Sequence, residues 1–550
     1  MPLQYPLLFL HGESGWSPDM HLRVAPSNKD TKLSINMYYS YLLHDRFNVY
    51  TLLLNGGRLF QQFVVDAYVC IEQSRLDYYR KNQNTFRNEF LQGIHDAIQQ
   101  GDLEGQSIGK RMILPSSFVG GPRYMYKHYL DALAICRVHG NPQYFITFTC
   151  NVKWPEIQRY MSKYPSLRPE DRPDSIARVF QIKAKSLIAF LKTKRPFGEV
   201  AADLYTIEFQ KRGLPHCHLL FWVTEACKIR SAAEVDNYIS AEIPDPEREP
   251  DLYMVVSDLM IHGPCGLVRP DSPCMSDGSC SKKYVVPYNQ TLSLHFMAHI
   301  NVEYCGWSLL IKYLFKYISK GADRIRYKVH KAVNAPDDTQ NAQPYIDEIQ
   351  NFVDGRFICP HEASWRILNF PIHYRNPLVQ VLSVHLENMQ NVTFKDNDQL
   401  DNVLENSYAK QTTLTEWLRN NQIDATGRHL RYVDYLLQDK WDLSAKVWIQ
   451  RASNKTPAIG RLIYVHPSSG ERFFLRMLLN HQRGCQSFKS IKTVHGDPVQ
   501  RTVLHVKSWA YLKTIKNGPM HSMRLQYGPL PPNCTHYSPI CFCTVTYQIP

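Results

Sequence analysis

The spacing of hydrophobic residues changes along the chain and predicts helices first and strands afterwards. From Lys32 to about Gln100, apolar residues recur at three- and four-residue intervals between charges, as in amphipathic helices. Residues 124–140 (YMYKHYLDALAICRVHG) repeat this pattern up to Gly140. Residues 144–150 (YFITFTC) are β-branched and aromatic with period two, which predicts a strand. The beginning of the chain is interrupted by Pro and Gly and is expected to be irregular.

The middle of the chain predicts a further helix, a pair of strands and a second helix. Residues 175–192 (SIARVFQIKAKSLIAFLK) are helical in pattern, and LYTIEFQ and HCHLLFWV read as two strands joined by a short turn, KRGLP. Residues 301–321 (NVEYCGWSLLIKYLFKYISKG) predict a helix that ends at Gly321. Short helices and strands are expected over 340–480, and the pattern weakens after Val494.

The second strand of the pair carries the His-x-His sequence of the chain. Because residues two apart on a strand share a face, His216 and His218 project together, as do Glu208 and Gln210 on the preceding strand. A short turn sets a carboxylate or amide oxygen beside the two imidazoles, a donor set that leaves positions open on a divalent ion. The alternative is a pair of hydrogen-bonded structural histidines.

A pair of tyrosines supplies candidate nucleophiles for such a site. Tyr313 and Tyr317 lie four apart on the helix predicted at 301–321, hence on one face, among four cations. Cationic surroundings favour a phenolate and attract a phosphate. The alternative is aromatic packing, since Tyr160 and Tyr164 share the spacing. The cations expected to bind DNA are Lys211, Arg212, Lys312, Lys316, Lys320 and Arg324.

A segment at 260–285 is rich in Gly, Pro, Ser and Cys and offers a third candidate site. Its four soft ligands give the spacing H-x2-C-x8-C-x5-C, and four such ligands suit a tetrahedral structural Zn²⁺. The alternative is a loop of unpaired thiols. These residues are His262, Cys265, Cys274 and Cys280.

Composition and charge limit the classes of protein to which this chain can belong. A chain of 550 residues is too long to fold around a single hydrophobic core, so more than one packed region is expected. Its net charge of +13 is compatible with a polyanionic partner. No apolar run is long enough to cross a bilayer, and the N-terminal stretch lacks the basic residues and cleavage site of a signal peptide. We therefore expect a protein that does not engage membranes and whose cysteines are thiols or metal ligands.

Three blocks, taken in order, resemble the Rep nuclease of Helitron rolling-circle transposons. They are ITFTCNVKWPEI, EFQKRGLPHCHLLFW and IKYLFKYISKGADR, and the likeness extends over about residues 1–495. The resemblance implies an α+β fold: an HUH nuclease core, with a central antiparallel sheet flanked by helices. The expected regions are a mostly helical one at 1–120, the core at 121–330 with the insertion at 260–285, a mixed α/β region at 331–494, and an irregular, divergent tail at 495–550.

The same resemblance implies a chemistry. Mg²⁺ or Mn²⁺ would polarise a phosphodiester of single-stranded DNA, one tyrosine would form a 5′-phosphotyrosine link, and the second would serve strand transfer. Gln210 matches the third metal ligand of related Rep proteins by position, with Glu208 as the alternative. A DNA substrate implies residence in the nucleus.

The sequence also departs from the family pattern. Helitron proteins continue into a Pif1-type helicase with a phosphate-binding loop, whereas GQSIGKR at 105–111 has the wrong spacing for one. We therefore expect a truncated copy that relies on a helicase supplied in trans. A catalytically inactive DNA-binding remnant is the competing hypothesis, and helicase activity is not expected.

Overall fold

The computed structural model describes most of the chain up to residue 498, in separate stretches. The chain divides into two compact units, 1–491 and 492–550. In the second unit the described residues form a strand pair, β12 (Thr493–Val494) and β13 (Asp497–Pro498). The described stretches are 1–22, 31–83, 112–209, 213–262, 284–305, 347–390, 411–452, 458–466, 469–494 and 497–498.

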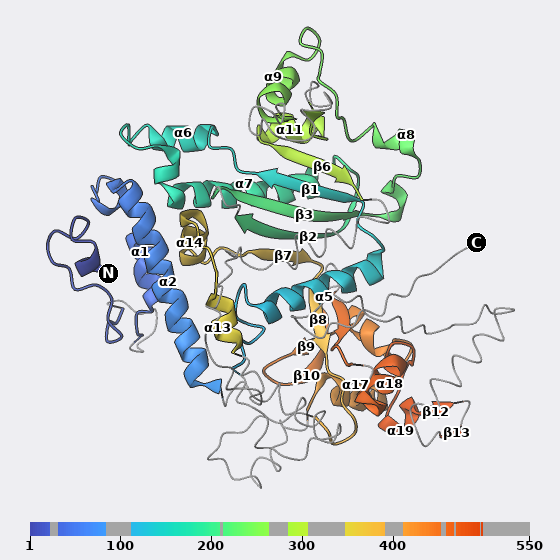
Figure 1. The fold of residues 1–550 in the computed structure, drawn as a ribbon. Helices are drawn as coiled ribbons and strands as arrows, with labels where there is room; N and C mark the ends of the chain where they lie inside the picture. The colour runs from blue at the N-terminus through green and yellow to red at the C-terminus, as the bar shows by residue number, and fades with distance from the viewer. Residues whose placement is uncertain are drawn as a thin grey trace, which may run out of the picture. The chain divides into compact units, whose positions relative to one another are not determined.

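A five-stranded antiparallel sheet forms the centre of the first unit, in the order β6-β1-β3-β2-β7 (Figure 1). Strands β2 and β3, which the sequence predicts as a pair, lie side by side and antiparallel. The α+β class and the central antiparallel sheet are thereby confirmed. The strands are β1 (Tyr144–Thr149), β2 (Val200–Phe209), β3 (Pro215–Val223), β6 (Ile300–Tyr304) and β7 (His373–Asn376).

Both faces of the sheet are covered, which explains why β3 is buried along its whole length. On one face, alternate residues such as Ile146, Phe148 and Leu219 pack against α7 (Pro173–Lys194). On the other face, the end of the sheet formed by Phe145, Leu204, Leu220 and Trp222 packs against α5 (Pro122–His139). This second apolar patch reaches the histidines, where Phe145 stacks on His218 with ring centroids 5.8 Å apart, and the rest of that face is polar.

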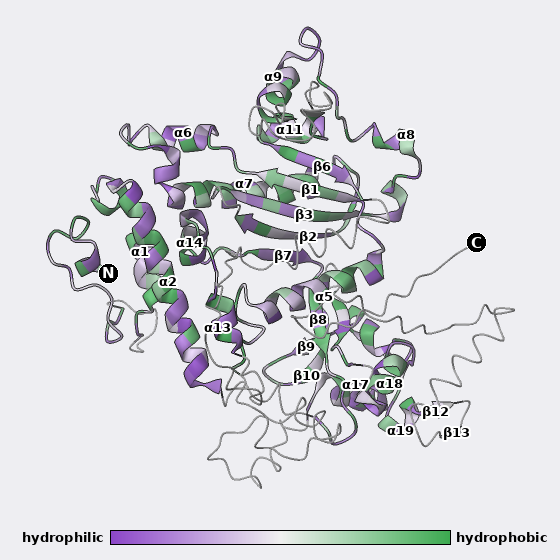
Figure 2. Ribbon diagram, viewed as in Figure 1, coloured by the Kyte–Doolittle hydropathy of each residue, from purple (hydrophilic) through white to green (hydrophobic). Residues whose placement is uncertain are grey.

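The N-terminal helices α1 (Ile35–Leu42) and α2 (Arg58–Lys81) form a separate hydrophobic cluster with α14 (Pro360–Ile367). Along α2, hydrophobic and hydrophilic stretches alternate, as expected of a helix with one buried side (Figure 2). Arg356 pairs with Glu72 of α2 and with Glu362 of α14, at 3.2 Å from the latter. This ion-pair network is buried, so it fixes α14 against α2.

The C-terminal part of the first unit is built around short elements. Strands β8 (Val379–Leu382) and β11 (Ile459–Leu462) pair in parallel, and β9 (Asp439–Asp442) and β10 (Val447–Gln450) pair antiparallel. Its helices are α17 (Thr413–Ile423), η9 (Tyr432–Leu437), α18 (Glu471–Leu479) and α19 (Phe488–Ile491).

The remaining elements connect these parts. The described helices not yet given are η1 (Pro2–Gln4), η2 (Leu53–Asn55), α6 (Pro155–Met161), η4 (Pro169–Asp171), η5 (Glu225–Cys227), α8 (Ala232–Val235), α9 (Pro250–Leu259), α11 (Gln290–Phe296) and α13 (Glu348–Val353). Strands β4 (Ile261–His262) and β5 (Tyr284–Val285) pair at the two ends of the cysteine-rich segment.

One predicted element is wrong at its start. The helix expected at 301–321 begins instead as a strand, because β6 pairs with β1 along the edge of the sheet. Ile300 and Val302 alternate with the polar Asn301 and Glu303. This period of two places both apolar side chains on one buried face of the strand. The rest of the expected helix, from residue 306, lies outside the described residues.

Candidate metal and nuclease site

The two histidines of the His-x-His sequence lie next to each other on one face of β3, as their spacing predicts. β3 is the middle strand of the sheet, with β1 on one side and β2 on the other. His216 and His218 are only 7% and 6% exposed. They lie at the edge of the apolar patch that packs against α5, and Phe145 of that patch stacks on the ring of His218.

Two threonines of β1 hold the imidazole rings. Thr149 lies opposite His216 in the register, and Thr147 lies opposite His218. The Oγ1 of Thr149 is 2.9 Å from Nδ1 of His216, and the Oγ1 of Thr147 is 3.2 Å from Nδ1 of His218. Each ring is thus contacted at the same nitrogen by a side chain of the neighbouring strand.

Glu208 of β2 brings a carboxylate to the pair. It lies opposite His216 in the register, yet its Oε2 reaches diagonally to within 3.2 Å of Nε2 of His218. Glu208 is therefore the predicted oxygen donor that the structure places at the histidines. Gln210, the other candidate, lies outside the described residues.

Burial keeps His216 neutral at physiological pH. Desolvation, together with the neighbouring His218, lowers the pKa of His216 to about 4, against a smaller opposing effect of Glu208. A neutral imidazole has a lone pair to offer to a metal ion. The charge state of this ring therefore fits the role of a ligand.

His299 is a third histidine in this cluster, and sequence reasoning missed it. Its Nδ1 is 3.5 Å from Oγ1 of Thr149, and its backbone oxygen accepts a hydrogen bond from the Thr149 amide. The residue directly precedes β6. Recognising β6 as a strand by its period of two would have indicated that His299 meets the end of β1.

The donors present fit a divalent cation, although the set is incomplete. Two ligands about 2.1 Å from one ion and at right angles lie about 3.0 Å apart, close to the 3.2 Å between Glu208 and His218. On the same face, Asn301 Oδ1 is a buried oxygen without a hydrogen-bond partner. Within the described stretches, no three His, Cys, Asp or Glu side chains are already arranged to hold a metal ion.

The described segment that leads into β3 meets α14 at Gly213. Gly213, directly after residues 210–212, has a φ of +94°, and a Cβ there would lie 2.9 Å from Nδ1 of His361. His361 is buried, its two ring nitrogens have no hydrogen-bond partner, and burial lowers its pKa to about 4. Cys359 donates to the Gly213 carbonyl at 3.7 Å. Helix α14 and the residue before it thus fix the position of Gly213.

A half-buried polar cluster continues the site face across β7 and α5. His373 lies opposite Thr206, which itself lies opposite His218. The His373 ring stacks on His128 of α5 with centroids 4.3 Å apart, and Arg375 lies 3.1 Å from Nδ1 of His128. The sequence showed no sign of this cluster, because its members are brought together by strand pairing over long range.

Tyr160 and Tyr164, which share the spacing of the candidate nucleophiles, have a structural role. Both hydroxyls donate to Asp45, and the guanidinium of the fully buried Arg172 lies against both rings. Burial raises the pKa of Tyr160. This pair therefore joins α6 to the chain after α1.

Several predicted site residues lie outside the described residues, and their roles stay predictions. They are Tyr313, Tyr317, Gln210, Lys211, Arg212, Lys312, Lys316, Lys320, Arg324, Cys265, Cys274 and Cys280. Of the predicted zinc ligands, His262 is described: it ends β4 and pairs with Tyr284 of β5. This pairing closes the cysteine-rich segment at its base.

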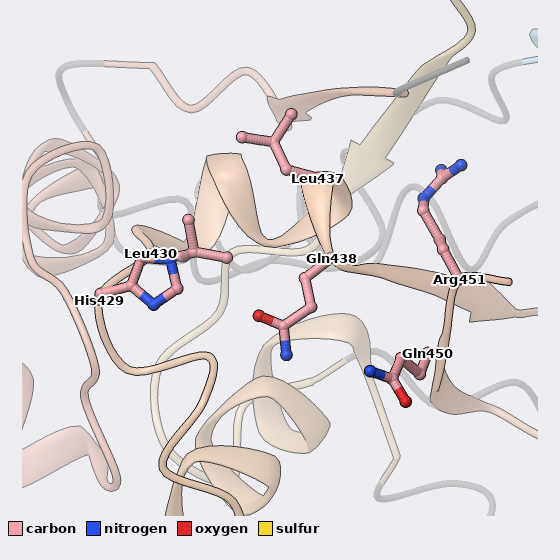
Figure 3. Close-up of a pocket in the computed structure, with 6 residues that line it drawn as sticks. All are labelled: His429, Leu430, Leu437, Gln438, Gln450 and Arg451. Atoms are coloured by element: carbon pink, nitrogen blue, oxygen red, sulfur yellow. The ribbon is translucent and has the colours of Figure 1, made fainter. Parts of the chain in front are cut away.

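A pocket of about 350 Å³ lies in the C-terminal part, and its lining includes no predicted site residue (Figure 3). It has no carboxylate or thiol in its wall, so it does not compete with the histidine strand as a metal site. Its lining residues are His429, Leu430, Leu437, Gln438, Gln450 and Arg451.

The histidine strand lies in the part of the chain that matches a known family. Residues 38–221 match the family model of the Helitron helicase-like domain at the N-terminus. The match supports a Helitron-related protein. The matched segment runs from within α1 into β3 and contains both histidines, both threonines and Glu208. No curated protein matches the chain. Among the described helices, none combines the length and apolar character required to span a membrane.

Proposed function

We propose that this protein is a nuclease of the HUH type that nicks and joins single-stranded DNA in Helitron transposition. The observation that supports it most is the pair of histidines on the central strand, each contacted at Nδ1 by a threonine, with Glu208 beside His218. The match to the Helitron helicase-like domain suggests a transposon-related DNA-processing role.

In this proposal, His216, His218 and Glu208 hold Mg²⁺ or Mn²⁺, with Gln210 as a further candidate ligand. When bound, the ion supplies Lewis-acid polarisation of the scissile phosphate. The strand holds the imidazoles at fixed spacing, and burial of His216 keeps its lone pair available at neutral pH.

The covalent step assigns the nucleophile to Tyr313 or Tyr317. The phenol oxygen forms a bond to phosphorus and loses its proton, the bond from phosphorus to the 3′ oxygen breaks, and that oxygen takes up a proton. The products are a 5′-phosphotyrosine link and a free 3′-OH. The reverse step, with another 3′-OH as the attacking group, joins strands. The DNA substrate implies a nuclear location.

Covalent adduct formation tests this function. Purified protein is incubated with labelled single-stranded DNA and Mn²⁺, and the denatured mixture is separated by electrophoresis. We expect a shifted band that disappears in Tyr313→Phe/Tyr317→Phe and in His216→Ala/His218→Ala. Tyr164→Phe is the matched control, because this tyrosine belongs to the structural pair, and it should keep the adduct.

The alternative hypothesis, an inactive DNA-binding remnant, makes a different prediction. Single-stranded DNA would then bind with a strong dependence on salt, while no adduct would form with Mg²⁺ or Mn²⁺. An adduct that survives loss of both tyrosines would also contradict the assignment of the nucleophile.

A further inference from the structure

Thr147 and Thr149 stand out because they make the same contact with two different histidines. They lie two apart on β1, so both project to the site face, and each faces its own imidazole across the strand pair. Their hydroxyls contact Nδ1 in both cases, at 3.2 Å and 2.9 Å. One such contact would be ordinary for a buried histidine, but two in register leave both rings turned the same way.

We infer that Thr147 and Thr149 are positioning residues of the proposed metal site, accepting a hydrogen bond from Nδ1–H so that both histidines present Nε2 to the cation. The inference rests on the proposed function, since it concerns the same ion. It assigns a role to two side chains that do not themselves bind the metal.

The chemistry of the groups supports this role. A neutral imidazole carries one N–H and one lone pair, so a partner that accepts from Nδ1–H leaves the lone pair on Nε2. In His218, that nitrogen faces Glu208 at 3.2 Å. A hydroxyl can donate as well as accept, so it also suits the ring before the cation arrives. Such outer partners fix ring orientation and raise ligand affinity.

The branched side chain of threonine also restricts where its hydroxyl can lie. Threonine is branched at Cβ, so its χ1 angle is restricted and its hydroxyl is held in place by the strand. Thr149 is further fixed, because its Oγ1 also lies 3.5 Å from Nδ1 of His299. Both rings are thus positioned by side chains of β1, which pairs with the central strand β3.

The sheet offers a matched control for a test. Thr206 lies on β2 opposite His218, on the same face, and is buried, but its hydroxyl has no hydrogen-bond partner. Replacing it with valine removes the same group from an equivalent position without touching an imidazole nitrogen. A merely structural role of the threonines would make all three valine variants behave alike.

The experiment measures Mn²⁺ binding to the full chain by calorimetric titration. We expect Thr147→Val and Thr149→Val to weaken binding by about 10- to 100-fold, Thr206→Val to leave it unchanged, and Thr149→Ser to restore most of the affinity. Thermal melting of each variant checks that it is folded. If a valine variant does not fold, the affinity of the serine variant still tests the role of the hydroxyl.

The outcomes separate this inference from the function on which it rests. Equal affinities in the wild type and all three valine variants would overturn the positioning role while leaving the metal site intact. Binding that does not depend on His216 and His218 would overturn both the metal site and the inference. Binding that responds as expected, in a protein that forms no DNA adduct, would support the inference and contradict the nuclease.

Discussion

His361 provides a prediction whose size follows from its surroundings. The ring is buried in α14, neither nitrogen has a hydrogen-bond partner, and burial lowers its pKa from about 6.5 to about 4. As the pH falls, the unfolded chain therefore binds a proton at this position before the folded chain does. The free energy of unfolding decreases from about pH 6.5 towards pH 4. For these two pKa values, the loss between pH 7.5 and pH 5.0 is about 2 kcal/mol.

His361→Leu removes this contribution. We expect the variant to be within about 1 kcal/mol of the wild type at pH 7.5, because it loses an imidazole that makes no hydrogen bond. Between pH 7.5 and pH 5.0, the free energy of unfolding of the variant should rise by about 2 kcal/mol relative to that of the wild type. Urea unfolding followed by tryptophan fluorescence at both pH values measures the difference. Ser364→Ala, at a buried and uncharged position of the same helix, is the control and should keep the wild-type pH dependence. An equal loss of stability in His361→Leu and in the wild type would refute the reasoning.

Three further predictions concern other parts of the structure. Arg356→Met leaves the buried Glu72 without its cation and should cost about 3 to 5 kcal/mol in urea unfolding. The double variant Glu72→Gln/Arg356→Met should recover part of that cost, and strict additivity would contradict the pairing. Gly213→Ala should cost about 1 to 3 kcal/mol in the same assay, because φ is +94° and the new Cβ would meet His361. Glu208→Gln should weaken Mn²⁺ binding about 10-fold or more in a calorimetric titration; unchanged affinity would exclude this carboxylate as a ligand.

The parts of the fold that were predictable are those in which local pattern and final environment agree. β1, β2 and β3 were evident from their period of two, and the spacing of His216 and His218 sufficed to place both on one face. The helix at 175–192 was equally evident, since α7 buries one side against the sheet. In these segments the sequence and the packing impose the same period.

Other parts depend on contacts that no local pattern reveals. The sequence of β6 predicts the start of a helix, because the apolar run that follows it continues at helical spacing and hides five residues of alternation. The threonines were present in the first of the three family blocks, but their link to the imidazoles follows only from the register of β1 against β3. His299 and His373 reach the site face in the same way, through strand pairing over long range.

The order of the strands bears on which shortened versions of the chain will stay monodisperse. β7 closes the outer side of β2 although it lies far along the sequence, as the hydrogen bond from Asn376 to Asp203 across 173 positions illustrates. A chain ended at residue 221 or 330 would leave the ten-residue β2 with a row of open amide and carbonyl groups. Such an edge recruits strands from other molecules. Soluble production of the histidine-bearing sheet should therefore require synthesis to continue beyond residue 376, and closure of the sheet should be a late, slow event during folding.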